Sequence, residues 1–178
     1  MTHKKGVSMT KKSAPTIERT LVLLKPDAVK RGLMGKIIER FENAGLKIIG
    51  MKMTRPSKEI ALAHYTEDLA KRRGQHIRDM MVDFIKSSPI LAIAIEGHNA
   101  IENVRMMAGD TEPKTAQPGT IRGDFSHISF AGANAQKKVV QNIIHASANK
   151  KDAKKELYVW FNENELFDYK TVHEIHTF

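Results

Sequence analysis

The sequence contains no cysteine, which excludes thiol catalysis, thiolate zinc sites and a disulfide framework. It also lacks a long apolar segment, because the longest apolar run, Ile90 to Ile95, is far too short to cross a bilayer. The first residues are basic and polar, without the apolar stretch of a secretory signal, so we expect a cytoplasmic protein without membrane contact. The chain of 178 residues is 41% hydrophobic, which is enough for one folded domain.

Acidic residues are outnumbered, and the formal net charge is +9. Residues 1–14 hold four lysines and no acidic residue. A basic surplus favours a polyanionic partner, such as nucleic acid, a phosphorylated small molecule or an acidic membrane surface. We expect residues 1–16 to form a basic flexible tail, 17–170 the folded domain and 171–178 a C-terminal tail. Nucleic-acid binding by the first tail is the alternative to a merely solubilising extension.

Apolar periodicity divides the domain into alternating strands and helices. It predicts strands at 20–24, 46–54, 90–95 and 139–144, and helices at 37–44, 57–65, 77–85, 99–107 and from 149 onward. Gly45 is placed as a helix C-cap, and Ser57 and Asn149 as N-caps. Residues 108–138 show little periodicity, which is typical of a functional or flexible loop. The order indicates an α/β pattern but leaves a parallel and an antiparallel ferredoxin-like sheet open.

The common nucleotide-binding and metal-binding motifs are missing. The segment from Gly32 to Lys36 has the wrong glycine spacing for a P-loop, and no GxGxxG occurs. His173 and His176 are three residues apart, but this lone pair is weak evidence for a metal site. Of the other histidines, His3, His64, His76, His98 and His127 are interpreted as surface residues or as members of local hydrogen bonds.

His145 differs, because it falls at the end of a predicted strand, immediately before a capped helix. On a helical wheel, Glu156 falls at the edge of the apolar stripe formed by Ala153, Leu157 and Trp160. A carboxylate turned inward needs a partner. His145 could supply it, and the contact would fix the histidine tautomer and leave one nitrogen as a nucleophile. The alternative is that Glu156 reaches out to water.

Lys25, Arg105 and Arg122 each lie beside an apolar element or a glycine-rich turn. Alone, each is a solvated charge. Together with a histidine, they would provide the charges needed for phosphoryl transfer, since arginine matches the geometry of phosphate oxygens.

A set of ordered motifs from about Glu18 to Phe161 resembles the nucleoside diphosphate kinases. The motifs are Lys25-Pro26-Asp27-Ala28-Val29, Arg31-Gly32-Leu33, Ile37-Ile38-Glu39-Arg40-Phe41-Glu42, His64-Tyr65, Glu96-Gly97, Arg105, Gly109-Asp110-Thr111, Pro118-Gly119-Thr120-Ile121-Arg122-Gly123-Asp124-Phe125, Asn142-Ile143-Ile144-His145-Ala146-Ser147, Glu156 and Leu157-Tyr158-Val159-Trp160-Phe161.

The resemblance implies an α+β, ferredoxin-like (βαββαβ) fold, a four-stranded antiparallel sheet with helices packed over it, assembled as a homo-oligomer (tetramer or hexamer). It implies ping-pong transfer of the γ-phosphoryl group from a nucleoside triphosphate to a diphosphate, with Mg²⁺ carried on the nucleotide phosphates rather than by a protein metal site. By this likeness His145 is the phosphorylated nucleophile and Glu156 orients it. Further positions match residues that bind the nucleotide or support the active site: Lys25, Tyr65, Ile77, Arg105, Thr111, Arg122, Asn142 and Ser147.

The chain departs from the family pattern at three places. Ile77 stands where the family has an aromatic residue against the base, residues 126–141 carry an insertion, and Ala146 replaces a glycine. The alternatives are a relative in which catalysis is secondary and which binds nucleic acid, and a phosphohistidine donor to proteins.

Overall fold

The computed structural model describes residues 17–172 and 174–177. Its strands form an antiparallel sheet in the order β2-β3-β1-β4. The strands are β1 (Ile17–Leu24), β2 (Lys47–Thr54), β3 (Ile90–His98) and β4 (Ile144–Ala146). This order confirms the ferredoxin-like prediction and excludes the parallel sheet that periodicity alone left open. Residues 1–16, the expected basic tail, lie outside the described part of the chain.

The helices fill the connections between the strands. They are α1 (Pro26–Lys30), α2 (Met34–Asn43), α3 (Lys58–His64), α4 (Glu67–Arg73), α5 (Gln75–Lys86), α6 (Ala100–Ala108), α7 (Ile121–Phe125), α8 (Phe130–Ala135), α9 (Lys150–Trp160) and α10 (Glu174–Thr177), with 3₁₀ turns η1 (Pro113–Thr115) and η2 (Glu163–Glu165). The predicted N-caps are confirmed, since Ser57 accepts from the Ile60 amide and Asn149 from the Asp152 amide. No helix in residues 17–172 and 174–177 is both long and apolar enough to cross a membrane.

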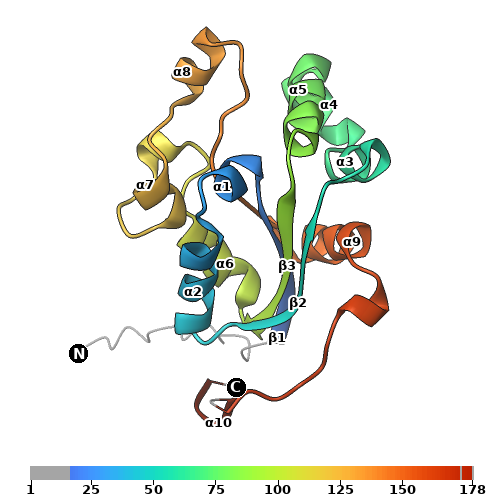
Figure 1. Cartoon of the computed structure of the whole chain (residues 1–178), viewed down its shortest axis with the longest axis vertical. Coiled ribbons are helices and arrows are strands. Elements are labelled where there is room, and N and C mark those ends of the chain that lie inside the picture. Colours follow the sequence, from blue (N-terminus) through green and yellow to red (C-terminus); the bar gives the residue numbers. More distant parts are fainter. Residues whose placement is uncertain (1–16, 173, 178) are drawn as a thin grey trace, which may run out of the picture.

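Helices cover both faces of the sheet, and β1 shows why. Its residues 21–24 are all apolar and fully buried. Val22 and Leu24 pack in a cluster with side chains from α2 and α6, whereas Leu21 and Leu23 pack with side chains from α3, α5 and α9. Figure 1 shows α2 and α6 on one side of the sheet and α3 and α9 on the other. A strand buried on both faces reads as a continuous apolar run, and β1 does so.

Two parts of the sequence prediction differ from the structure. The predicted strand at 139–144 is wrong, because the extended strand begins only at Ile144 and continues through His145 to Ala146. Ile143 has a φ of 70°, which no strand residue adopts, so the apolar pattern imitated a strand across a turn. Residues 108–138 contain η1, α7 and α8, short helices with too few turns to show a period, and α1 and α4 were not predicted either.

Candidate active site

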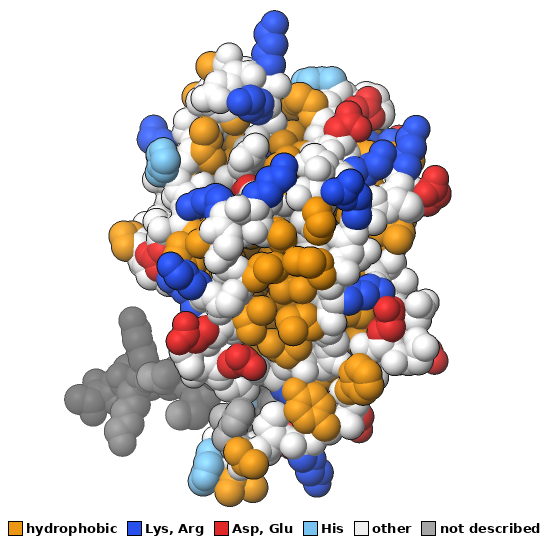
Figure 2. Space-filling model, viewed as in Figure 1, with side chains coloured by type: hydrophobic (Ala, Val, Ile, Leu, Met, Phe, Trp, Pro, Cys, Tyr) orange, Lys and Arg blue, Asp and Glu red, His pale blue; other side chains and the backbone are white. Residues whose placement is uncertain are grey.

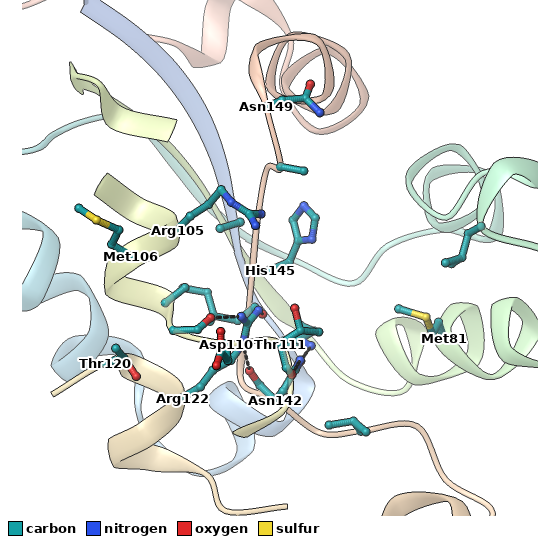
Figure 3. Close-up of a pocket in the computed structure, with 18 of the residues that line it drawn as sticks. Met81, Arg105, Met106, Asp110, Thr111, Thr120, Arg122, Asn142, His145 and Asn149 are labelled. Atoms are coloured by element: carbon teal, nitrogen blue, oxygen red, sulfur yellow. Dashed lines mark hydrogen bonds between the residues drawn. The ribbon is translucent and has the colours of Figure 1, made fainter. Parts of the chain in front are cut away.

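A pocket of about 1300 Å³ opens where α6, α7, β4 and the α4–α5 helices approach one another. Its size suits a nucleotide-sized ligand. Figure 3 shows Arg105 and His145 in its upper centre, with Thr111, Arg122 and Asn142 below. Eight of the predicted site residues line it: Lys25, Tyr65, Ile77, Arg105, Thr111, Arg122, Asn142 and His145. The fold therefore gathers into one cavity residues up to 120 positions apart in the sequence.

Glu156 and Ser147 are not among the pocket-lining residues but contact His145 or each other. Nε2 of His145 lies 2.9 Å from Oε2 of Glu156, and the Ser147 hydroxyl donates to the same oxygen at 2.6 Å. Glu156 projects from α9, which packs against β1 beside β4. Its side chain is only 16% exposed, so Glu156 is paired with the histidine rather than extended into water.

The electrostatics of this pair select one nitrogen of His145. Burial would raise the pKa of Glu156, but hydrogen bonding and the charge of His145 outweigh burial and lower it to about 2. An ionised carboxylate only accepts hydrogen bonds, so Nε2 carries the proton and Nδ1 keeps its lone pair. The unprotonated Nδ1 is then the nucleophilic nitrogen.

His64 is a member of this site that sequence reasoning placed elsewhere, as a surface or local residue. Its ring packs edge-to-face on the ring of His145, with centroids 4.5 Å apart, and its Nδ1 accepts from Trp160 Nε1 at 3.3 Å. Burial, reinforced by His145, lowers the pKa of His64 to about 3, so it is neutral. The sequence pointed to His64 only through the His64-Tyr65 pair at a predicted helix end. Only the tertiary structure shows that His64 lies beside His145 in β4.

Two cations of the pocket, Lys25 and Arg122, are buried beside Asn142. The ammonium of Lys25 contacts the amide oxygen of Asn142. Burial lowers the pKa of Lys25 to about 8, with Asp27 opposing this effect and Arg122 adding to it. Burial, together with Arg105, lowers the pKa of Arg122 to about 10, so Arg122 stays charged at neutral pH. The site is therefore electropositive and suits phosphate oxygens.

Arg122 also has a structural task that the sequence did not reveal. Its guanidinium donates to three backbone carbonyls, those of Asn142, Gly109 and Ile144, at 3.2, 2.6 and 2.7 Å. These bonds tie α7 to the chain that leads into β4. Arg122 therefore contributes positive charge to the pocket and also holds the backbone of segments that line it.

Part of the pocket lining is apolar and comes from α5 and the inserted segment. Ile77 and Met81 belong to α5, and Phe130 and Val139 to the insertion, which also contributes the polar Asn134 and Lys138. Ala146 does not need the glycine of the family pattern, because it is absent from the described non-glycine residues with positive φ.

Within the described residues, one group of possible metal ligands lies close together, namely His64, His145 and Glu156, which is the histidine–carboxylate pair with its neighbouring histidine. The predicted histidine pair cannot be assessed, since His173 lies outside the described residues.

Comparison with known proteins identifies a common family. Residues 18–166 match the family model for nucleoside diphosphate kinase. The chain is 43% identical over 155 residues to the nucleoside diphosphate kinase of Borreliella burgdorferi, covering 86% of this chain and 93% of that protein. It is 48% identical over 153 residues to that of Pyrococcus abyssi, covering 85% and 89%.

Solved structures agree with these matches. One is a transition-state mimic of the Borrelia burgdorferi enzyme with bound vanadate and ADP, at a TM-score of 0.88, 42% identity, and coverage of 90% of this chain and 96% of that one. Another is the Halobacterium salinarum enzyme in complex with CDP, at a TM-score of 0.77, 35% identity, and coverage of 90% and 97%.

Proposed function

Because this chain belongs to the nucleoside diphosphate kinase family, we propose that His145 is the residue that carries the phosphoryl group between its two nucleotide substrates. The enzyme transfers the γ-phosphoryl group of a nucleoside triphosphate to a nucleoside diphosphate. The observation that carries the assignment is the His145–Glu156 contact, which occupies Nε2 and leaves Nδ1 free in a pocket lined by cations.

Two displacements complete the reaction. Nδ1 of His145 attacks the γ-phosphorus, the bond from that phosphorus to the β–γ bridging oxygen breaks, and the diphosphate leaves. A terminal oxygen of the acceptor diphosphate then attacks the same phosphorus and breaks its bond to Nδ1. Glu156 stabilises the positive charge that the ring gains in the first step and loses in the second. A phosphoimidazole stays reactive enough to return the group, whereas a serine phosphate would not.

The remaining pocket residues are proposed to bind the nucleotide. Lys25, Arg105 and Arg122 neutralise the phosphates, whose charge is spread over several oxygens. Thr111 and Asn142 offer short polar groups, Tyr65 a neutral hydroxyl whose pKa is raised by burial, and Ile77 an apolar surface for the base. Ser147 holds Glu156.

The residues of this site fit a Mg²⁺ ion that is bound through the phosphates of the nucleotide. The described residues offer no cluster of three carboxylates there, while the phosphates themselves supply the oxygen ligands that Mg²⁺ prefers. When bound, it neutralises part of the phosphate charge.

The function is tested by isolating the phosphorylated enzyme. Enzyme labelled with γ-labelled ATP and freed of nucleotide should transfer its label to added GDP or CDP, and initial rates should give parallel double-reciprocal lines. An enzyme that exchanges phosphate without accumulating label would contradict the covalent step.

We predict that activity falls at high pH, and that this high-pH limb of the pH–activity profile reflects the deprotonation of Lys25. As pH rises through about 8, Lys25 loses its charge in the free enzyme, so kcat/KM for the diphosphate should fall about tenfold per pH unit. The substrate's own phosphate titrates lower, near a pKa of about 6, and does not produce this limb. In Lys25→Arg the limb should vanish up to about pH 9, below the range in which Arg122 loses its charge, while the exposed control Lys30→Arg should keep it; a limb that survives below about pH 9 in Lys25→Arg assigns it to another group.

We also predict broad acceptance of bases. The base is proposed to pack on Ile77 and the other apolar side chains of the lining, and apolar discrimination is worth only about 1–3 kcal/mol. The values of kcat/KM for GDP, CDP, UDP and dTDP with ATP as donor should span less than about a thousandfold, some 4 kcal/mol. Purines should be modestly favoured, because they bury more area. A wider spread would reveal a group that reads the base edge.

A homo-oligomer, tetramer or hexamer, is proposed from the family and from one surface. β2 is an edge strand of the sheet, and its Met51 and Met53 are about half exposed. Figure 2 shows hydrophobic side chains gathered near the middle of this face. Sedimentation equilibrium would measure the assembly.

A further inference from the structure

The chain turns sharply immediately before the strand that carries His145. Ile143 has a φ of 70°, and the amide of Ile144 donates to the carbonyl of Asn142 at 2.7 Å, closing a three-residue turn. A left-handed turn of this kind is rare and strained. A β-branched residue makes it more so, because its Cβ substituents crowd the backbone at positive φ. Ile143 is also fully buried, so solvent does not stabilise the turn.

Backbone groups of the turn are held by residues from two other parts of the chain, the segment of Lys25 and Asp27 and helix α7 with Arg122. The Ile143 amide donates to Oδ2 of Asp27 at 2.8 Å. The Ile143 carbonyl accepts from the Lys25 amide at 2.9 Å, and Arg122 donates to the carbonyls on either side. Such strain persists only where the surroundings enforce it, and here they do so from both sides of the peptide.

Asp27 stands out among these groups because it is a buried carboxylate with incomplete hydrogen bonding, although its charge interacts with Lys25 and Arg122. It is 6% exposed, and its other oxygen, Oδ1, is buried without a hydrogen-bond partner among the described residues. A half-satisfied buried carboxylate costs free energy. The residue lies in the first turn of α1, yet its side chain reaches a peptide 116 positions away. The hydrogen bond of its Oδ2 is to the Ile143 amide of the strained turn.

The turn lies between two side chains of the proposed mechanism. Asn142 begins it, and its amide group donates to the Thr111 carbonyl at 2.6 Å and contacts Lys25. His145 follows it by one residue in β4, which is only three residues long. A short strand has little pairing to fix its register, and a slip of one residue would turn His145 to the other face.

We propose that Asp27 is a positioning residue: it holds Ile143 in its left-handed conformation and through that turn places Asn142 and His145 in the pocket. This inference rests on the proposed function of His145. Asp27 touches neither substrate nor the reacting nitrogen. Without its carboxylate, Ile143 relaxes toward negative φ, and the peptides on both sides rotate with it.

The test is a double-mutant cycle that separates strain from packing. Asp27→Ala should lower kcat/KM for exchange by about a hundredfold, with kcat and KM both affected, because Asn142 and His145 flank the turn. Asp27→Asn keeps an acceptor for the Ile143 amide and should stay within about tenfold of the wild type.

The second site of the cycle is Ile143, replaced by glycine or alanine. Both remove the buried side chain, but only glycine adopts positive φ without strain. With Asp27 present, the two should have equal activities within about twofold, since the carboxylate holds the turn in either case. In the Asp27→Ala background, the glycine variant should exceed the alanine variant by about fivefold or more.

The same ratio of activities between the Ile143→Gly and Ile143→Ala variants in both backgrounds would overturn the inference. If Asp27 only stabilised the fold, its removal would not make activity depend on which residue adopts positive φ at position 143. Should Asp27→Ala not fold in thermal unfolding, Asp27→Leu, which fills the site but has no acceptor for the Ile143 amide, takes its place with a ratio of about fivefold or more again required. A wild-type enzyme without exchange would instead refute the proposed function, so the two failures are distinguishable.

Discussion

His145→Ala will lose nucleotide exchange by about four powers of ten or more, because the group transferred has no other carrier in the pocket. Incubation with γ-labelled ATP should label the wild type and leave this variant unlabelled. The label should survive base and be lost in acid, as a phosphorus–nitrogen bond does, and should be found on Nδ1, since Glu156 occupies Nε2.

The matched control for this experiment is His127→Ala, which removes an exposed histidine that does not line the pocket. It should label and exchange as the wild type does. Label that resists acid, or that persists in His145→Ala, would move the covalent step to another residue, and label on Nε2 would contradict the tautomer assigned from Glu156.

Glu156→Gln will slow phosphorylation of His145 by roughly one to three powers of ten, as removal of an orienting carboxylate does in other catalytic groups. The amide is nearly isosteric but carries no charge, so it neither fixes the proton on Nε2 nor stabilises the charged ring. Single-turnover labelling measures the rate, and nucleotide affinity, measured by calorimetry, should change little because Glu156 does not line the pocket.

Glu163→Gln is the control for Glu156, since Glu163 is exposed in η2 just beyond α9. It should leave the rate unchanged. If Glu156→Gln phosphorylates at the wild-type rate, the contact with His145 has no catalytic consequence, and an equal loss in both variants would indicate a general effect of altered charge.

Sequence periodicity anticipated the local elements well where they are amphipathic and long. The helices at α5 and α9, with the Asn149 cap, follow from side-chain spacing and a capping residue within a few positions. The placement of Glu156 at the inner edge of α9 came from the same spacing. It identified two partners for this carboxylate, His145 and water, but could not choose between them.

The choice needed the distance between α9 and β4, which no local pattern contains. The same limit explains the strand wrongly predicted at 139–144. The apolar pattern of that segment is typical of a strand, and only contacts with Asp27, Lys25 and Arg122 impose the left-handed turn at Ile143. His64 was assigned to the surface or to local hydrogen bonds for a similar reason, since its neighbour His145 lies 81 positions away.

The sequence by itself determined the alternation of strands and helices, the apolar faces and the ordered motifs that resemble a family, because these depend on the identity and spacing of nearby residues. The tertiary structure alone decided which strands pair, which face of each helix meets the sheet, which nitrogen of His145 is free and how the chain turns before it. These features depend on contacts between distant segments, where burial and hydrogen bonding override local preference.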